Sequence, residues 1–431
     1  MSAIIGDVSS DGASARWPPY HWLESPGIRP ITDMFWRANY NNDDVAIYSR
    51  FLEILRLSRS GLNGEEIGRI LSIHNVRKFL LGEKKSFLTH VRAELDRLGC
   101  PEPGFRWLPV QLKPRGTPGD EWVQVPSRIS KLEDLSKVID QRKISEDATE
   151  GMNEFGYKTR KELIPERVLL FGFLVGASIG DAGKHTKGES RFPSKALSLV
   201  LSTRKSNSYR FGEFTTLCAR ASLGLDMHRI ANSPPSKNRF TDAECFRWIS
   251  PASPLVGWLF HGCLGLEKGE MTTYNPLRME WLIDAPSPFK VSVFQGISES
   301  DGWVDAGDDT VCIVSSPNTP FFSAVLSTLG IIHRVDHQES VEIIRIPTEE
   351  AARLPIFSPR IRSVYFDRMN IMSRATSLPE RIKVPGEIVH AIREIAARTS
   401  VLSEICLELA KTRGVKVTSQ TVRKYIGQHG R

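Results

Sequence analysis

The sequence has few cysteines and no long apolar run, and each absence excludes a class of protein. Its six cysteines lie far apart and form no C-x-x-C pair, so neither a zinc ribbon nor a disulfide framework is indicated. The apolar run at residues 168–179 is about half the length that a membrane-spanning helix needs. The first residues show no basic segment followed by an apolar one, so we expect a cytoplasmic protein without a membrane partner.

The residues that a folded protein requires are present in ordinary amounts. Hydrophobic residues make up 40% and charged residues 25% of the 431 positions, which is typical of a globular protein rather than a disordered one. A chain of this length is too long for one compact core and predicts about two to four domains. The net charge of +7 favours a polyanionic partner but does not identify it.

The N-terminal part of the chain divides into three segments. Residues 1–44 combine prolines with aromatic residues and predict an extended arm, whereas residues 45–100 have the spacing of four short amphipathic helices. Asn63 followed by Glu66 is typical of a capping box. Residues 101–159 predict a connector rich in Pro, Gly and Trp. Its expected elements are two short strands near residues 106–109 and 122–126 and a charged helix at 131–143.

The helices of residues 45–100 have two interpretations. Two of them are short, lie close together in sequence and point apolar residues inward, which is typical of a helix-turn-helix. In that arrangement Arg77 and Lys78 would face a DNA groove. A plain four-helix cap explains the same pattern equally well, and the sequence leaves both interpretations open.

Two similar segments, at residues 174–183 and 294–304, are the strongest internal feature. Each is an apolar helix that ends in an aspartate beside a glycine, Asp181 in the first and Asp301 in the second. Each helix also carries two small residues four positions apart on one face: Gly176 and Gly180, and Gly296 and Ser300. Small residues at this spacing let two backbones approach closely, so we expect the two helices to pack on each other.

The order of elements after each segment is repeated. A strand near residues 196–202 and a helix ending before Gly224 follow the first segment. A strand at residues 311–315 and a helix ending before Gly330 follow the second. The sequence therefore predicts an internal duplication, with residues 160–284 as the first copy and residues 285–378 as the second.

The two segments carry a resemblance to a known family. Phe294-Gln-Gly-Ile-Ser-Glu-Ser-Asp-Gly resembles the second signature of the LAGLIDADG homing endonucleases, and Leu174-Val-Gly-Ala-Ser-Ile-Gly-Asp-Ala resembles the first. The resemblance covers about residues 160–375 and implies an α+β fold of two αββαββα units related by pseudo-twofold symmetry in one monomer. It further implies that the motif helices pack centrally and that two curved sheets form a saddle over double-stranded DNA. The first motif departs from the pattern because it ends Asp-Ala-Gly rather than Asp-Gly, so that Gly183 comes one position late.

The resemblance also implies a metal site and a DNA surface. Asp181 and Asp301 would meet at the end of the helix pair as catalytic residues and metal ligands, because paired carboxylates bind hard cations such as Mg²⁺. Such a cation can activate water and stabilise the leaving oxygen of a phosphodiester, and no small-molecule cofactor is implied. Strands at residues 197–205 and 311–315 would read bases. The expected DNA contacts from the sheet are Arg204, Lys205 and Arg210.

Several charged residues near the motifs have no assigned role. The basic residue that family members place near the metals has four candidates: Lys184, Arg204, Lys205 and Arg345. Asp305, Asp308 and Asp309 follow the second motif at a spacing that does not fit a calcium-binding loop. We interpret these three as solvated turn acids.

Residues 379–431 return to helical periodicity and predict a C-terminal module of three helices. Gly414 is expected to end the second helix and Thr418 to cap the third. The third helix would present Arg423 and Lys424 outward, which is typical of a second helix-turn-helix. A dimerisation or capping bundle would explain the same pattern.

Three functions follow from the sequence. The first hypothesis is Mg²⁺-dependent, site-specific cleavage of double-stranded DNA, because both aspartates are present. The flanking modules instead favour a DNA-binding transcription regulator without cleavage, since some bacterial regulators resemble a LAGLIDADG unit joined to a C-terminal helix-turn-helix. The third hypothesis is an intron RNA maturase, because the same saddle can hold folded RNA. The DNA-binding hypotheses would place the protein on DNA in a prokaryotic cytoplasm.

Overall fold

In the computed structural model, the chain forms two compact units. The first unit comprises residues 1–130, 186–198 and 252–269, and the second comprises residues 131–185, 199–251 and 270–431. The structure describes the following residues: 57, 60–72, 107–111, 122–126, 128–142, 151–185, 197–204, 209–230, 245–266, 270–272, 274–314, 317–338, 341–378 and 383–426.

The first unit contains the strands expected in the connector. Strands β1 (Trp107–Gln111) and β2 (Trp122–Pro126) pair antiparallel, and helix α12 (Pro254–Trp258) continues into a π turn at Leu259–Cys263. The indole of Trp258 donates to the carbonyl oxygen of Pro126 at 3.0 Å. This hydrogen bond ties the helix to the end of β2 across a long sequence separation.

Helix α5 (Gly64–Leu71) also belongs to this unit, and its capping box is confirmed. The side chain of Asn63 accepts from the backbone of Glu65 and Glu66, and the side chain of Glu66 accepts from the backbone of Asn63. These bonds satisfy amide groups that the first turn of a helix leaves without partners. Arg77 and Lys78 lie outside the described residues.

The second unit begins with short helices that lead into a long buried one. The charged linker helix is confirmed as α8 (Leu132–Asp140), and it is followed by η3 (Asn153–Phe155), α9 (Arg160–Leu163) and η4 (Ile164–Glu166). Pro165 fits the first turn, where its missing amide costs nothing. Helix α10 (Arg167–Ile179) then continues and is buried on nearly every side, as an apolar helix without a polar face must be.

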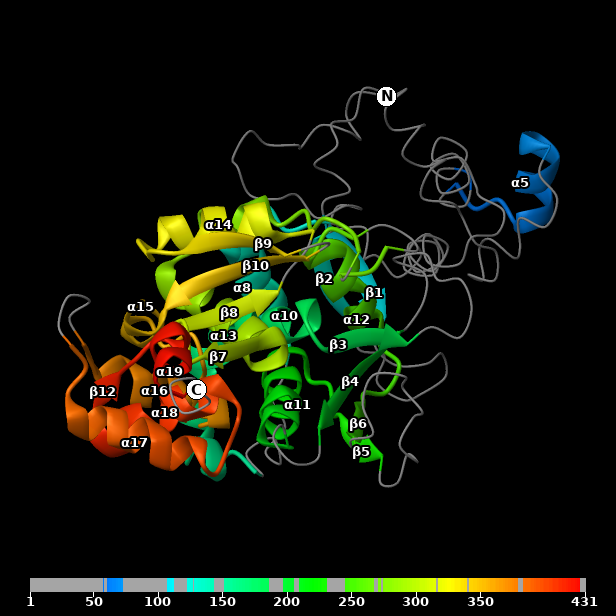
Figure 1. Cartoon of the computed structure of the whole chain (residues 1–431). Helices are drawn as coiled ribbons and strands as arrows, with labels where there is room; N and C mark the ends of the chain where they lie inside the picture. The colour runs from blue at the N-terminus through cyan, green and yellow to red at the C-terminus, as the bar shows by residue number, and fades with distance from the viewer. Residues whose placement is uncertain are drawn as a thin grey trace. The chain divides into compact units, whose positions relative to one another are not determined.

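Two four-stranded sheets follow the two motif helices. After α10 the chain forms β3 (Ala182–His185), β4 (Ser198–Arg204), α11 (Tyr209–Leu223), β5 (His228–Ile230) and β6 (Cys245–Ile249). After η6 (Glu280–Leu282) and α13 (Ser287–Asp301) it forms β7 (Gly302–Asp305), β8 (Thr310–Val314), α14 (Thr319–Thr328), β9 (Arg334–Gln338), β10 (Val341–Pro347) and α15 (Thr348–Arg353). The sheets have the orders β3-β4-β6-β5 and β7-β8-β10-β9. Both orders place the fourth strand between the second and the third (Figure 1).

Helices α10 and α13 pack with their backbones in contact at their glycines. A Cβ added at Gly176 would lie 2.0 Å from the carbonyl oxygen of Val293 and 2.9 Å from the Cα of Gly296. A Cβ added at Gly296 would lie 2.2 Å from the carbonyl oxygen of Phe173. Only glycine fits such a close approach, which places the two helices side by side at the centre of the unit.

Three more helices, preceded by α16 (Val364–Arg374), complete the second unit. They are α17 (Gly386–Ala396), α18 (Leu402–Arg413) and α19 (Ser419–Ile426). Gly414 ends α18 with a φ of 64°, and the hydroxyl of Thr418 accepts from the backbone of Thr421 at 3.2 Å. The three expected helices are thereby confirmed. In the described part of the chain, none of the helices has the length and apolar character needed to cross a membrane.

The substitution Gly296→Ala tests the backbone contact between the motif helices. The added methyl group overlaps the backbone of α10, so we expect the free energy of unfolding to fall by about 2 kcal/mol or more, as in other overpacked interiors. Urea denaturation measures this change. Gly386→Ala is the matched control, because nothing lies within 4 Å of an added Cβ there. Equal stability of the two variants would contradict the contact.

Candidate functional site

The contact between the motif helices brings their C-terminal ends together. Asp301 is the last residue of α13, and Gly180 caps the end of α10, directly before Asp181. A Cβ added at Gly180 would lie 2.0 Å from the hydroxyl oxygen of Ser300 and 2.9 Å from Oδ2 of Asp301. The carboxylate of Asp301 therefore lies against the backbone that immediately precedes Asp181. Asp181 itself is exposed, and Asp301 is half-buried.

Burial sets the protonation of Asp301. Removal of the carboxyl group from water raises its pKa from 3.8 to about 6, because the charged form loses hydration. Among the described residues none donates a hydrogen bond to this carboxylate. A desolvated carboxylate of this kind gains from a nearby cation.

The chemistry of the two aspartates can be compared with what a Mg²⁺ ion requires. Within the described ranges there is no group of three or more His, Cys, Asp or Glu side chains arranged to hold a metal. Mg²⁺ is commonly held by one or two carboxylates and otherwise by water and phosphate oxygens. Two carboxylates such as those of Asp181 and Asp301 are compatible with this chemistry.

A buried glutamate on the same helix holds a loop in place. Glu299 is buried, and its pKa is raised from 4.5 to about 8 by desolvation. Its Oε1 accepts from the backbone N–H of Ser358 at 2.9 Å, and Gln295 one turn earlier donates to the carbonyl oxygen of Pro355 at 2.8 Å. The segment 355–363 is thus fastened to α13. We did not predict this role, although a glutamate inside an apolar helix is a signal for it.

Arg360 in the same segment reaches the start of the first motif helix. Its guanidinium donates to both carboxylate oxygens of Glu166, at 2.8 and 3.0 Å, and to the carbonyl oxygen of Phe155 at 2.9 Å. It also lies over the ring of Tyr157, 4.1 Å from the centroid. Both bonds to Glu166 come from Nη2, and hydrogen bonds between charged groups are stronger than those between neutral ones. The segment therefore connects the residues before α10 to α13.

The first sheet has one open face, on which polar and apolar side chains mix. Ser202 on β4 pairs in register with Arg247 on β6, and both side chains lie on the face opposite the buried Leu201 and Trp248. His228 on β5 is exposed at the edge of the same face. This surface can donate hydrogen bonds to phosphate or base edges. The alternation along Cys245–Ile249 could have identified Arg247, which we did not predict.

Of the three basic residues expected on this sheet, Arg204, Lys205 and Arg210, the structure places Arg204 there. Arg204 is the last residue of β4, and Lys205 lies outside the described residues. The expectation that Arg210 lies on the sheet is wrong, because it belongs to the first turn of α11. Its guanidinium donates to the carbonyl oxygens of Glu154 and Arg360. The physical reason is that the helix begins earlier than its apolar residues indicate.

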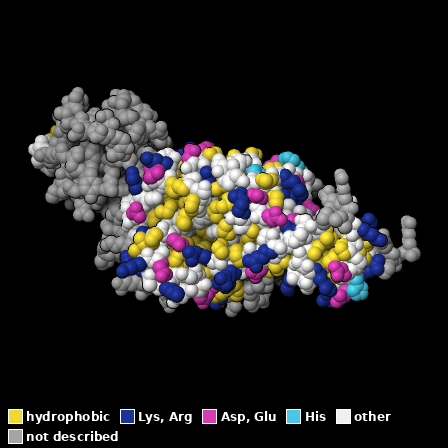
Figure 2. Space-filling view, turned by 90° about the vertical axis from the view of Figure 1, so that its left-hand side faces the viewer, with side chains coloured by type: hydrophobic (Ala, Val, Ile, Leu, Met, Phe, Trp, Pro, Cys, Tyr) yellow, Lys and Arg dark blue, Asp and Glu magenta, His cyan; other side chains and the backbone are white. Residues whose placement is uncertain are grey.

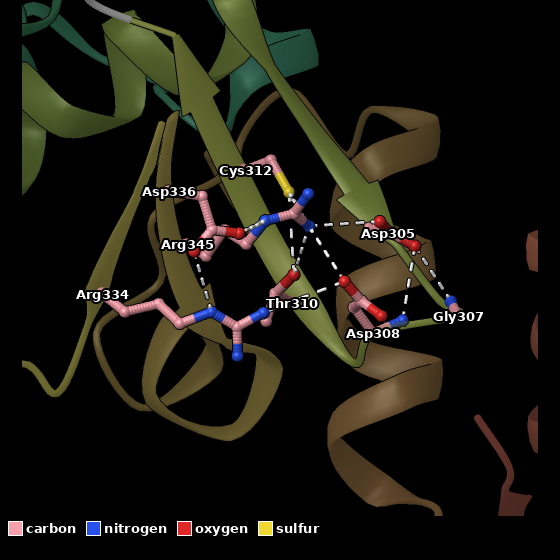
Figure 3. A network of polar contacts seen from close by, with 8 residues as sticks. All are labelled: Asp305, Gly307, Asp308, Thr310, Cys312, Arg334, Asp336 and Arg345. Carbon is pink, nitrogen blue, oxygen red and sulfur yellow. Dashed lines mark hydrogen bonds and ion pairs between the residues drawn. The ribbon is translucent and has the colours of Figure 1, made fainter. Parts of the chain in front are cut away.

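The second sheet has a network of ion pairs on the corresponding face. Arg345 on β10 is buried, and its Nη1 lies 3.2 Å from Oδ2 of Asp305 and 3.4 Å from Oδ2 of Asp308. Its Nε lies 2.6 Å from Oδ2 of Asp336, and Nη1 also contacts the thiol of Cys312 at 3.2 Å. Figure 3 shows the three carboxylates surrounding the guanidinium. Arg345, one of the four candidates for a basic residue near the metals, is therefore engaged within the sheet instead.

The expectation that the acids after the second motif are solvated is wrong for Asp305 and Asp309, whereas Asp308 is exposed. Asp305 and Asp308 pair with Arg345, and Oδ2 of Asp309 lies 2.8 Å from the buried Nζ of Lys416. Both cations come from residues far downstream that fold back onto the turn. A local turn pattern holds no information about such partners.

The expectation that residues 311–315 read bases is wrong for the first three of them. Val311, Cys312 and Ile313 have no exposed surface, because β8 lies between β7 and β10 and is covered on both faces. The ion pairs of Arg345 cover the side on which Cys312 lies. Base contacts from these three side chains would require that network to open.

The C-terminal helix presents the expected basic side. Gln420, Arg423 and Lys424 are exposed on α19, and Val422 is buried. On the face shown in Figure 2, the described side chains of Lys and Arg are interspersed with Asp, Glu and apolar surface. Candidate contacts to a polyanion therefore belong to particular elements, such as α19, rather than to the whole face.

Comparison with known proteins gives weak and partial similarities. No protein-family model matches the chain, and no curated protein matches it. Two homing endonucleases are among the similar solved structures. I-DmoI in complex with DNA and Mn is 13% identical, covers 43% of this chain and 93% of its own, and has a TM-score of 0.30. I-WcaI bound to its DNA recognition sequence is 12% identical, covers 51% and 97%, and has a TM-score of 0.30.

A third similar structure is full-length DUF199/WhiA from Thermatoga maritima. It is 11% identical, covers 67% of this chain and 96% of its own, and has a TM-score of 0.30. At this level of similarity no residue role is transferred from any of the three proteins. The proposed function therefore depends on the residues of the site itself.

The raised pKa of Asp301 predicts that its charge destabilises the metal-free fold. Because the folded-state pKa of about 6 lies above the ordinary value of 3.8, this group's contribution to stability is full below the ordinary value and is lost as the pH rises through 6. Asp301→Asn removes the charge. In chelator-treated protein it should raise the free energy of unfolding near pH 8 by up to about 3 kcal/mol, since one pKa unit corresponds to about 1.4 kcal/mol.

The same substitution should give little gain near pH 4. Chemical denaturation at both pH values measures the difference. Ser300→Ala, one residue away and without a titrating group, should keep the pH dependence of the unmodified protein. A gain from Asp301→Asn that is equal at both pH values would show that the charge is not its cause.

Proposed function

We propose that the protein binds double-stranded DNA at specific sequences and cleaves a phosphodiester bond with Mg²⁺, in the manner of a homing endonuclease. The observation that supports this most directly is the contact between Gly180 and the carboxylate of Asp301. It joins two aspartate-bearing helix ends that are 120 residues apart in the chain, Asp181 and Asp301. The two αββαββα units act as halves of one saddle, so the chain functions as a monomer.

Asp181 and Asp301 hold the cation in this proposal. The metal supplies activation of water and stabilisation of the leaving oxygen. The carboxylate of Asp301 is ionised above about pH 6, so cation binding and activity increase with pH through that range. Arg345, the candidate basic residue whose side chain the structure describes, is engaged with three carboxylates and is not available to this pair.

The first sheet and the C-terminal helix supply the DNA contacts. Ser202, Arg247 and His228 are available on the open face of the first sheet, and Arg423 and Lys424 are available on α19. Arginine can pair with the edge of guanine, whereas lysine on phosphate adds affinity without sequence preference. Arg77, Lys78, Arg204 and Lys205 are further candidate contacts.

A randomised pool of DNA duplexes incubated with the protein and Mg²⁺ tests the proposal. We expect a retained consensus and new DNA ends at a fixed position within it, both read by sequencing. Asp181→Asn and Asp301→Asn should abolish the new ends while the consensus is still retained. Ends that persist in both variants would exclude the aspartate pair as the metal site.

A DNA-binding regulator without cleavage is the second candidate. The observation that favours it is the C-terminal helix α19, whose exposed Gln420, Arg423 and Lys424 suit a helix-turn-helix. A retained consensus without new ends under Mg²⁺, Mn²⁺ or Ca²⁺ would select this function over cleavage. Preference for folded RNA over every duplex would instead favour the maturase.

Arg247→Ala tests the first sheet as a reading surface. We expect its affinity for the selected duplex to fall by about tenfold or more, because one good arginine contact to a base contributes about 1–3 kcal/mol of discrimination. Fluorescence anisotropy at one fixed salt concentration measures this change. Arg353→Ala is the control, because Arg353 is exposed on α15 and pairs with Glu350 at 2.8 Å. Equal losses in the two variants would indicate general electrostatics.

A further inference from the structure

The C-terminal module, defined as helices α17, α18 and α19, is fastened to the second sheet at the turn between β7 and β8. Lys416, in the connection before α19, is buried, and its Nζ lies 2.8 Å from Oδ2 of Asp309 and 3.1 Å from Oε1 of Glu349. Asp309 also accepts from the hydroxyl of Thr348 at 2.5 Å. A buried ammonium held by two carboxylates is costly to expose or to leave unpaired.

The start of α19 is in backbone contact with the same turn. The N–H of Ser419 donates to the carbonyl oxygen of Gly307 at 3.1 Å. A Cβ added at Gly307 would lie 1.9 Å from the hydroxyl oxygen and 3.2 Å from the Cβ of Ser419. There is no space between the module and the sheet at this point.

Helix α18 packs against α16, which precedes the module in the chain. Met369 and Met372 of α16 and Ile405 and Leu409 of α18 are completely buried. Arg368 pairs with Glu404 at 2.8 Å across the two helices. Strands β11 (Thr376–Ser377) and β12 (Val415–Lys416) add a parallel pairing, and the N–H of Thr376 donates to the carbonyl oxygen of Gly414 at 2.8 Å. Within the described residues, these contacts hold the module at three separate places.

Two ends of the module carry exposed cations. Arg423 and Lys424 on α19 and Lys411 and Arg413 in the last turn of α18 all have exposed side chains. Gln420 is exposed beside them. Cations and amides at the end of a helix pair are suited to phosphate and base edges of a duplex.

We propose that the C-terminal module reads a second DNA segment at one fixed distance from the segment bound at Asp181 and Asp301. This inference rests on the proposed binding of double-stranded DNA and adds a restriction on spacing. A tethered module would accept many spacings. A module held in place by Lys416, Ser419 and the core of α16 and α18 accepts one spacing only. The second DNA segment must lie at the distance of the module and must also turn the correct side of the DNA helix towards it.

The test uses the full-length protein and the duplex selected from the random pool. Footprints of the unmodified protein and of the double variant Arg423→Ala/Lys424→Ala identify the segment contacted by α19. Insertions of 5 and 10 base pairs are then placed between the two segments, since about 10–10.5 base pairs make one DNA turn. We expect either insertion to lower the affinity of the unmodified protein to that of the double variant.

The substitution Gly307→Val tests whether the fixed spacing depends on the contact between the module and the second sheet. The larger side chain overlaps Ser419, so this variant should bind the selected duplex more weakly and lose its sensitivity to insertions. Gly386→Val, at the start of α17 where an added Cβ meets nothing, should behave like the unmodified protein. The double variant Asp309→Asn/Glu349→Gln leaves Lys416 without its carboxylates and provides a second test if Gly307→Val does not fold.

Two results would overturn the inference while leaving DNA binding intact. The first is equal affinity of the unmodified protein for duplexes with and without insertions, which would mean that the module is tethered. The second is tighter binding by Gly307→Val, which would mean that docking inhibits the module. Failure of the unmodified protein to retain any duplex would overturn the proposed function, and the inference with it.

Discussion

The structure of the second unit depends on one steric constraint, the absence of side chains at Gly176 and Gly296. Their backbones touch, and this contact sets the separation of α10 and α13. The separation in turn decides how close the helix ends come, and therefore whether two carboxylates can share a cation. A single methyl group at either glycine would move the helices apart, and the effect would extend to the aspartates.

The sequence predicts the helices well and the charged contacts poorly. The motif helix from Ser287 to Asp301, the capping box at Asn63 and the three C-terminal helices depend on local patterns, which the sequence contains. The partners of Asp305 and Asp309 depend on Arg345 and Lys416, which fold back from distant positions. Local chemistry cannot identify such partners, so the sequence alone favours solvated turn acids at positions that the fold uses for ion pairs.

The two sheets have the same strand order but different surfaces. The first leaves Ser202 and Arg247 available on its open face, whereas the second encloses Arg345 within three carboxylates. Two sheets with the same strand order therefore carry different chemistry. The second sheet uses this face for internal ion pairs, and its turn between β7 and β8 also supports the C-terminal module.

The pairing of Asp309 with Lys416 has a consequence for how the chain matures. These residues are 107 positions apart, so during synthesis the second sheet is complete long before its buried cation has emerged from the ribosome. Until then the turn carries a carboxylate without its partner, and α16 exposes the methionines that later face α18. The turn between β7 and β8 thus reaches its final form only when the last helices have been translated.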